Sequence, residues 1–291
     1  MLTLGQAHLL CAVLFAVDLL ARAWRIRWYV EAQGEPLRVP DALVLNAWGD
    51  AAAGLTPMRL AGEPARLAGM LRAGLPATVS FMAIGLEVVV AYPVVFAVGG
   101  FLVWRYAPDW WSQAGPSLKQ ALARGWPWAA AVLLLTVLVW VVVWRRKRLV
   151  LREPARGKAR IAALGAATPR WAILGGIPTS FVNVAARTCM LPVLALTLPE
   201  HPPFGVMLVG SFVLLYAQLV LPTPAGAGAV DLGFLGGMAG DLGADETGLL
   251  LAWRFWTVGA GILLGTALAL HAVGAGPLLA AVRRVVRRPG R

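Results

Sequence analysis

The residues that could do chemistry are charged side chains inside long apolar runs. Arg187 and Arg254 each lie near the middle of such a run. A charge at the centre of a membrane-spanning helix costs about 3 kcal/mol, so each guanidinium needs an anionic partner inside the protein. Two kinds of partner fit. One is a carboxylate of the chain, with Glu63, Glu87 and Asp231 as candidates; the other is a substrate phosphate, whose oxygens match the planar donor fork of arginine.

The acidic residues in the apolar regions differ in their surroundings. Glu87 has no basic residue close to it in its run, so it needs a distant partner or a bound proton, and a proton-relay role stays open. Asp18 precedes Arg22 by four residues, which favours an ion pair on one face of a helix. The other ionisable candidates in apolar regions are Asp50, Glu63, Arg66 and Asp231. We expect Arg66, Arg187 and Arg254 to bind substrate, and Glu63, Glu87 and Asp231 to balance charge or couple proton movement.

A turn rich in proline and glycine interrupts the apolar region near the C-terminal end, with the sequence LPTPAGAG at 221–228. No strand precedes it and the G-x-G-x-x-G spacing is absent, so it is not a dinucleotide-binding fingerprint. Backbone amides at the start of the following helix would attract an anion, and a plain bend without a ligand is the alternative. The predicted substrate-binding residues of this turn are Thr223, Pro224, Gly226 and Gly228.

Motifs for several kinds of catalysis are missing from the sequence. There is no G-x-S-x-G elbow, no Walker A motif and no kinase signature. The three histidines and two cysteines are scattered without metal-ligand spacing. The sequence therefore predicts a protein that is not an enzyme and that needs neither a metal nor another cofactor.

Composition identifies the surroundings of these residues as a membrane. Of 291 residues, 59% are hydrophobic and 14% charged, whereas a soluble domain is about half apolar and about a quarter charged. A spanning helix needs about 20 apolar residues. The predicted spans are 4–24, 77–104, 127–144, 171–198 and 247–273. The net charge of +12 has no folded basic domain to carry it, so nucleic acid is not an expected partner.

Two further apolar regions, 41–74 and 204–240, are too long for loops and too broken for simple helices. In lipid, such breaks persist only where protein or a water-filled cavity satisfies the freed backbone groups. We expect each region to be a re-entrant helical hairpin. The two enter from opposite sides, and each turns at a Thr-Pro pair, Thr56-Pro57 and Thr223-Pro224. This pattern predicts an inverted repeat whose substrate site lies where the hairpins meet.

Basic residues give the predicted orientation, because short cytoplasmic loops collect lysine and arginine. They cluster at Arg22, Arg25 and Arg27 after the first span, in a loop at 145–170, and at 283–291. This places the N-terminus outside and the C-terminus in the cytoplasm. The fold class is an all-α polytopic membrane protein with a single membrane domain over 1–291. Its predicted parts are repeat one (4–104), a linking span with the basic loop (127–170), repeat two (171–273) and a basic tail (274–291).

Four segments of the chain resemble one family. The run at 221–231 resembles the P-T-P-G-G-x-G-x-x-E signature of the flippase-like membrane proteins, which include the transmembrane flippase portion of lysylphosphatidylglycerol synthetases. Ala225 replaces the first glycine of the pair, and Asp231 replaces the glutamate. Residues 46–74 are similar to the family's N-x-x-x-P-x-x-x-G-E-x-x-R region. The segments LLARAWRIRWYV at 19–30 and LAWRFWT at 251–257 are similar to two further family segments.

This resemblance implies a protein that moves an amphiphilic, phosphate-bearing lipid between leaflets, without aminoacyl transfer. The expected substrate is a phospholipid or a polyprenyl-phosphate-type lipid, and anionic headgroups are expected at the basic loops. We therefore predict a multi-pass lipid translocase of the inner membrane, with a homodimer left open. The alternative is a non-transporting scaffold that recruits envelope-lipid enzymes through the basic loop. Under the first hypothesis, Arg254→Ala should abolish lipid movement.

Overall fold

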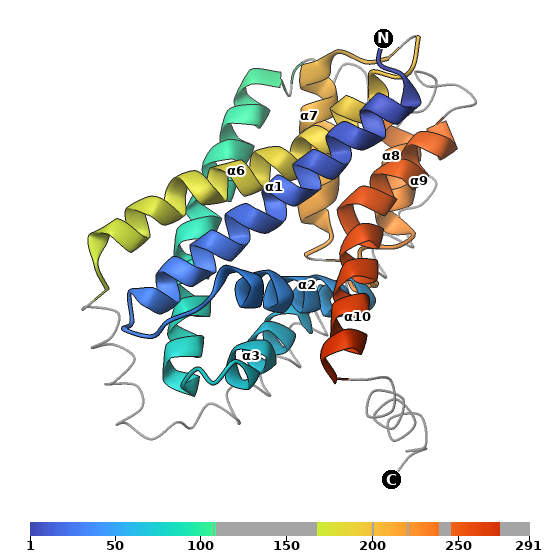
Figure 1. Ribbon diagram of the computed structural model, residues 1–291. Helices are drawn as coiled ribbons and strands as arrows, with labels where there is room; N and C mark the ends of the chain where they lie inside the picture. Colours follow the sequence, from blue (N-terminus) through green and yellow to red (C-terminus); the bar gives the residue numbers. More distant parts are fainter. Residues whose placement is uncertain (107, 109–167, 200, 220, 239–245, 274–291) are drawn as a thin grey trace.

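The computed structural model describes residues 1–106, 108, 168–199, 201–219, 221–238 and 246–273, and its regular structure is helical (Figure 1). The predicted span at 127–144, all but the end of the basic loop, and the tail at 274–291 lie outside the described residues. The elements are α1 (Leu4–Glu31), α2 (Val39–Leu55), α3 (Gly62–Arg72), the helix Ala77–Tyr106, α6 (Arg170–Ala195), α7 (Phe204–Ala217), α8 (Ala229–Met238), α9 (Glu246–Arg254), the π-helical turn η2 (Phe255–Gly259) and α10 (Ala260–Val273).

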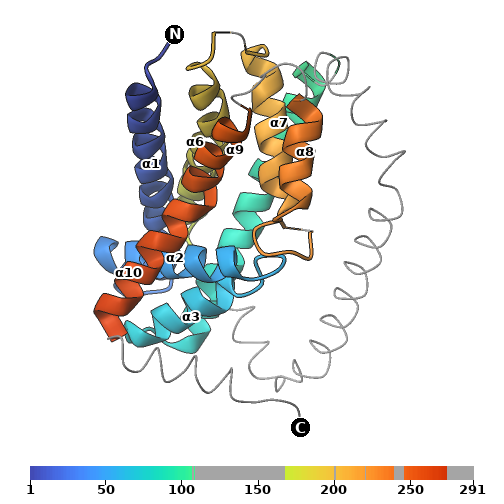
Figure 2. The same cartoon turned by 90° about the vertical axis from the view of Figure 1, so that its right-hand side faces the viewer.

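Four of the described helices are long and apolar enough to cross a membrane. They are Leu4–Glu31, Ala77–Tyr106, Arg170–Ala195 and the continuous stretch Glu246–Ala272, which joins α9, η2 and α10. Each matches one of the predicted spans. The protein is therefore a multi-pass membrane protein, and its N-terminus and the end of α10 lie at opposite ends of the bundle (Figures 1 and 2).

Helix α1 is longer than predicted. A capping box begins it, in which the Thr3 hydroxyl accepts from the Gln6 amide, and the helix continues to Glu31. Arg22 and Arg25 consequently belong to the helix, and Arg25 is only 2% exposed. The prediction that these two arginines follow the first span is wrong, because they belong to its helix and their side chains pair with carboxylates inside the bundle.

Each of the two broken apolar regions forms a pair of helices joined by a turn. Helices α2 and α3 make the first pair, and α7 and α8 make the second. In both views α2 runs across the direction of α7 (Figures 1 and 2). The two turns touch, since Pro57 and Pro224 form an isolated antiparallel bridge and the Met58 amide donates to the Leu221 carbonyl at 3.2 Å. Two turns far apart in the sequence thus lie side by side.

Small residues allow α10 to pack closely against α2. A Cβ atom added at Gly265 would lie 2.0 Å from the carbonyl oxygen of Ala47, and one added at Gly261 would lie 3.1 Å from the Cβ of Asp50. Glycines at such positions let helix backbones approach closely. The approach matters for the site, because α2 carries Asp50 and leads into the turn that contacts Pro224.

We predict that Gly265→Ala lowers the free energy of unfolding by about 1–3 kcal/mol, the usual cost of overpacking, because the added methyl group meets the α2 backbone. Gly248→Ala is the matched control, since nothing lies within 4 Å of a Cβ added there. The measurement is unfolding by SDS titration, followed by tryptophan fluorescence. Equal stability of the two variants would show that α10 and α2 are not this close.

Candidate functional site

Three separate groups of charged side chains join different elements in the described part of the chain. The first is the Asp231 pair, in which Arg254 Nε lies 2.6 Å from Asp231 Oδ1 and Arg254 Nη1 donates to the Ala225 carbonyl at 2.7 Å. The other Asp231 oxygen accepts from the Gly228 amide at 2.9 Å. The anion at the start of α8 is therefore a carboxylate of the chain itself. One cation and one anion leave this group neutral.

The turn that carries the Asp231 pair has an unusual backbone. Ala225, Gly226 and Gly228 have φ angles of 48°, 69° and 82°. This left-handed region suits glycine, whereas an alanine there is strained by about 1 kcal/mol. The departure from the family signature at Ala225 thus falls on a position where glycine is the better residue. The bonds from Arg254 to Ala225 and Asp231 hold the turn in this conformation.

The second group is the Glu87 cluster, made of Arg25, Glu63, Arg66 and Glu87. Glu87 is buried, with one oxygen paired to Arg25 and the other to Arg66. Arg66 also contacts Glu63 at 3.1 Å, and Arg25 donates to the Ser180 hydroxyl at 3.0 Å. Two arginines balance two carboxylates. The cluster ties α3 to α1 and to the helix Ala77–Tyr106, and Glu87 has the basic partners that its own run lacks.

The third group is the Arg22 cluster, made of Asp18, Arg22, Asp50, Arg59 and Arg187. Arg22 lies 2.8 Å from Asp18 and 2.6 Å from Asp50. The pairing of Asp18 with Arg22 agrees with their spacing in the sequence. Arg59 and Arg187 make longer contacts, each 3.7 Å, to Asp50 and Asp18 respectively. Three arginines face two carboxylates, so this is the one group of the three with a surplus positive charge.

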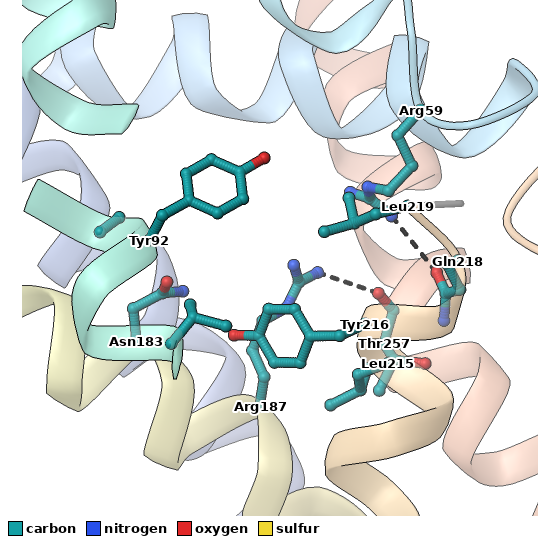
Figure 3. Close-up of a pocket in the computed structure, with 11 residues that line it drawn as sticks. Arg59, Tyr92, Asn183, Arg187, Leu215, Tyr216, Gln218, Leu219 and Thr257 are labelled. Atoms are coloured by element: carbon teal, nitrogen blue, oxygen red, sulfur yellow. Dashed lines mark hydrogen bonds between the residues drawn. The ribbon is translucent and has the colours of Figure 1, made fainter. Parts of the chain in front are cut away.

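The surplus charge faces a cavity of about 180 Å³ (Figure 3). Arg187 enters it from α6 and Arg59 from the turn between α2 and α3, so the two guanidinium groups approach one space from different sides. Arg187 Nη2 also donates to the Thr257 carbonyl in η2 at 3.0 Å. Besides Thr257, the other polar residues that line the cavity are Tyr92, Asn183, Tyr216 and Gln218. Two arginines with weak carboxylate contacts can bind an added anion.

The structure separates the predicted site residues. Arg187 lines the cavity, whereas Arg66 and Arg254 belong to the two neutral groups. Pro224 lies at the contact between the turns. Thr223 has a buried hydroxyl with no hydrogen-bond partner among the described residues. Arg25 and Arg66 are buried, whereas Arg187 and Arg254, which the sequence places near the middle of apolar runs, are only partly buried.

The cavity residues that the sequence did not single out are Arg59, Tyr92, Asn183, Tyr216 and Gln218. Arg59 had a usable signal, because it lies two residues after Pro57 in a region expected to meet the second hairpin. The others had none, since a tyrosine, asparagine or glutamine near an apolar run is as common in ordinary helix packing.

Fold and site together define a helical, multi-pass membrane protein with a positively charged cavity between its helices. The sequence model of the lysylphosphatidylglycerol synthase TM region matches residues 3–281, and the chain belongs to this family. No curated protein and no solved structure matches the sequence. The family match is to the transmembrane region of the synthase, so it gives no ground for assigning aminoacyl transfer to this chain.

We predict that Glu87→Gln lowers the free energy of unfolding by about 3–5 kcal/mol, because it leaves two buried arginines with one carboxylate. Glu31→Gln is the control, since Glu31 pairs with Arg27 at 2.6 Å where both side chains are about a third exposed. There we expect a change under about 1 kcal/mol. Thermal unfolding in detergent gives the comparison. Similar losses in the two variants would contradict a structural role of the Glu87 cluster.

Proposed function

We propose that this protein is a lipid translocase, which moves a phosphate-bearing lipid between the leaflets of the cytoplasmic membrane. The observation that carries the proposal is the surplus positive charge of the Arg22 cluster at the cavity. Arginine binds phosphate through two parallel hydrogen bonds. A lipid phosphate between Arg59 and Arg187 would neutralise the cluster.

Comparison with the two neutral groups supports a ligand at this place. In the Glu87 cluster and the Asp231 pair, the chain matches its arginines with an equal number of its own carboxylates. An uncompensated cation within a membrane protein is costly, and such residues usually line a substrate or ion pathway. A role limited to packing would not need a third arginine beside Asp18 and Asp50.

The two hairpins fit the same proposal. We take α2–α3 and α7–α8 as re-entrant halves of an inverted repeat, which bring their turns together beside the substrate, as in transporters built from such repeats. Arg59 of one turn, and Gln218 and Leu219 of the other, line the cavity. In this proposal Arg59 and Arg187 bind the lipid headgroup. Arg66 and Arg254 instead stabilise the hairpins, through ion pairs with Glu63, Glu87 and Asp231.

This assignment changes what replacement of Arg254 would report. Because Arg254 bonds to both Asp231 and Ala225, its loss would loosen the turn between α7 and α8 as well as affect transport. Arg187 is the sharper probe of headgroup binding, since it lies on a spanning helix and lines the cavity. We also propose that the protein lies in the inner membrane with its C-terminus in the cytoplasm.

The test is transport by purified protein in phosphatidylcholine vesicles, with either fluorescent phosphatidylglycerol or fluorescent polyprenyl phosphate as the probe. We expect one of these lipids to cross, and Arg187→Gln to slow it at least about tenfold, since a hydrogen bond to a charged group contributes about 1.5–3 kcal/mol. Arg27→Gln, which changes a partly exposed ion pair, should transport at the wild-type rate.

Two results would contradict the proposal. One is transport of neither lipid by the folded wild-type protein, which would favour a non-transporting scaffold. The other is transport by Arg187→Gln at the wild-type rate, which would remove the cavity from the pathway. Thermal unfolding of each variant, measured in the same detergent, separates loss of binding from loss of folding.

A further inference from the structure

The position of Arg59 depends on contact between the two turns. Arg59 lies two residues after Pro57, which bridges to Pro224, and one residue after Met58, whose amide donates to the Leu221 carbonyl. No other pair of segments in the described chain forms a β-bridge. The α7–α8 turn therefore contacts the backbone just before Arg59 and fixes its position.

The backbone at this point needs such support. Met58 and Arg59 have φ angles of 51° and 56°, and two successive non-glycine residues in the left-handed region persist only where their surroundings hold them. Within its own turn, the Thr56 hydroxyl donates to the Ala52 carbonyl at 2.8 Å and accepts from the Ala61 amide at 3.1 Å. These bonds close the turn, and the bridge to the second turn fixes where its tip lies.

The Arg59 side chain is held more weakly than its backbone. Its Nη1 donates to Gln218 Oε1 at 3.5 Å, and its Nη2 lies 3.7 Å from Asp50 Oδ1, while Asp50 is already bound by Arg22 at 2.6 Å. Gln218 is only 1% exposed and is neutral, so it orients Arg59 without cancelling its charge. Figure 3 shows the Arg59 side chain extending toward the cavity and toward Gln218. Its guanidinium is free to exchange these long contacts for closer ones.

We propose that Arg59 is a second headgroup-binding residue, which the docked turns present to the cavity opposite Arg187, and that the turns must separate for the headgroup to pass. Gln218 is its positioning residue. Docking would complete the phosphate site, and undocking would withdraw one of its two cations. This inference rests on the proposed function and adds to it the contacts that position Arg59 and a movement of the turns.

Binding is tested with dihexanoyl phosphatidylglycerol and, separately, inorganic phosphate, each titrated into the detergent-solubilised protein by calorimetry. Arg59→Gln should bind the short lipid at least about tenfold more weakly, and Arg59→Lys should fall between Arg59→Gln and wild type, because lysine keeps the charge but loses the planar fork. Arg27→Gln should bind as wild type. Phosphate binding that also depends on Arg59 would identify the phosphate group as what is recognised. Wild-type affinity of Arg59→Gln for both probes would overturn the proposal.

Movement is tested by locking the turns with a disulfide. Paired residues across an antiparallel bridge have Cα atoms about 4.5–5.5 Å apart, within the range that a disulfide spans. Pro57→Cys with Pro224→Cys, in a Cys11→Ala and Cys189→Ala background, should therefore crosslink on oxidation. We expect the oxidised protein to bind the short lipid within about twofold of the reduced form, yet to transport lipid at least about tenfold more slowly, with recovery on reduction.

Recovery on reduction shows that the doubly substituted protein is folded. Equal transport before and after oxidation would overturn the requirement that the turns separate, and lost binding on oxidation would overturn the docked turns as the binding state. These failures differ from failure of the proposed function. Transport that depends on Arg187 but not on Arg59 or the disulfide overturns the further inference alone, whereas absence of transport by wild type overturns both.

Discussion

Arg22 binds two carboxylates at once, and the charge distribution of the protein depends on this contact. Asp18 lies one turn earlier on the same helix, and Asp50 lies on α2. Because both acids are occupied at short distance by Arg22, Arg59 and Arg187 keep only long contacts with them. The surplus of positive charge therefore falls on the two arginines that line the cavity, and not on the one buried between the helices.

The two neutral groups, the Glu87 cluster and the Asp231 pair, connect the helical hairpins to neighbouring helices. The Glu87 cluster ties α3 to two long helices, and the Asp231 pair ties α8 to the end of α9. Between these groups, the contacts of the two turns include one bridge, a backbone hydrogen bond of 3.2 Å from Met58 to Leu221, and a contact of 3.5 Å from Arg59 to Gln218. A backbone hydrogen bond contributes about 1 kcal/mol, far less than a buried ion pair loses when one partner is removed. The contact between the turns is thus weaker than the ion pairs on either side of it, which suits a movement at that point.

Much of this architecture could be predicted from the sequence, because its signals are local. Long apolar runs predicted the four described spans, and prolines with glycines predicted both turns. The spacing of Asp18 and Arg22 predicted their ion pair. The partners of Arg25 and Arg66 could not be predicted, since the Glu87 cluster joins residues from separate helices. Local hydropathy also ended the first span too early, because it counts a buried, paired arginine as if it were in water. Asp231 was among the carboxylates named as candidate partners of Arg254, but the sequence left open whether Arg254 pairs with one of them or with a substrate phosphate.

A structure of the protein in lipid nanodiscs that contain phosphatidylglycerol and a polyprenyl phosphate would show directly whether Arg59 and Arg187 bind the headgroup. We expect density for a lipid phosphate in the cavity, within hydrogen-bond distance of both arginines, while Arg66 and Arg254 keep their carboxylate partners. A lipid phosphate bound to Arg66 or Arg254, with no lipid in the cavity, would contradict this assignment.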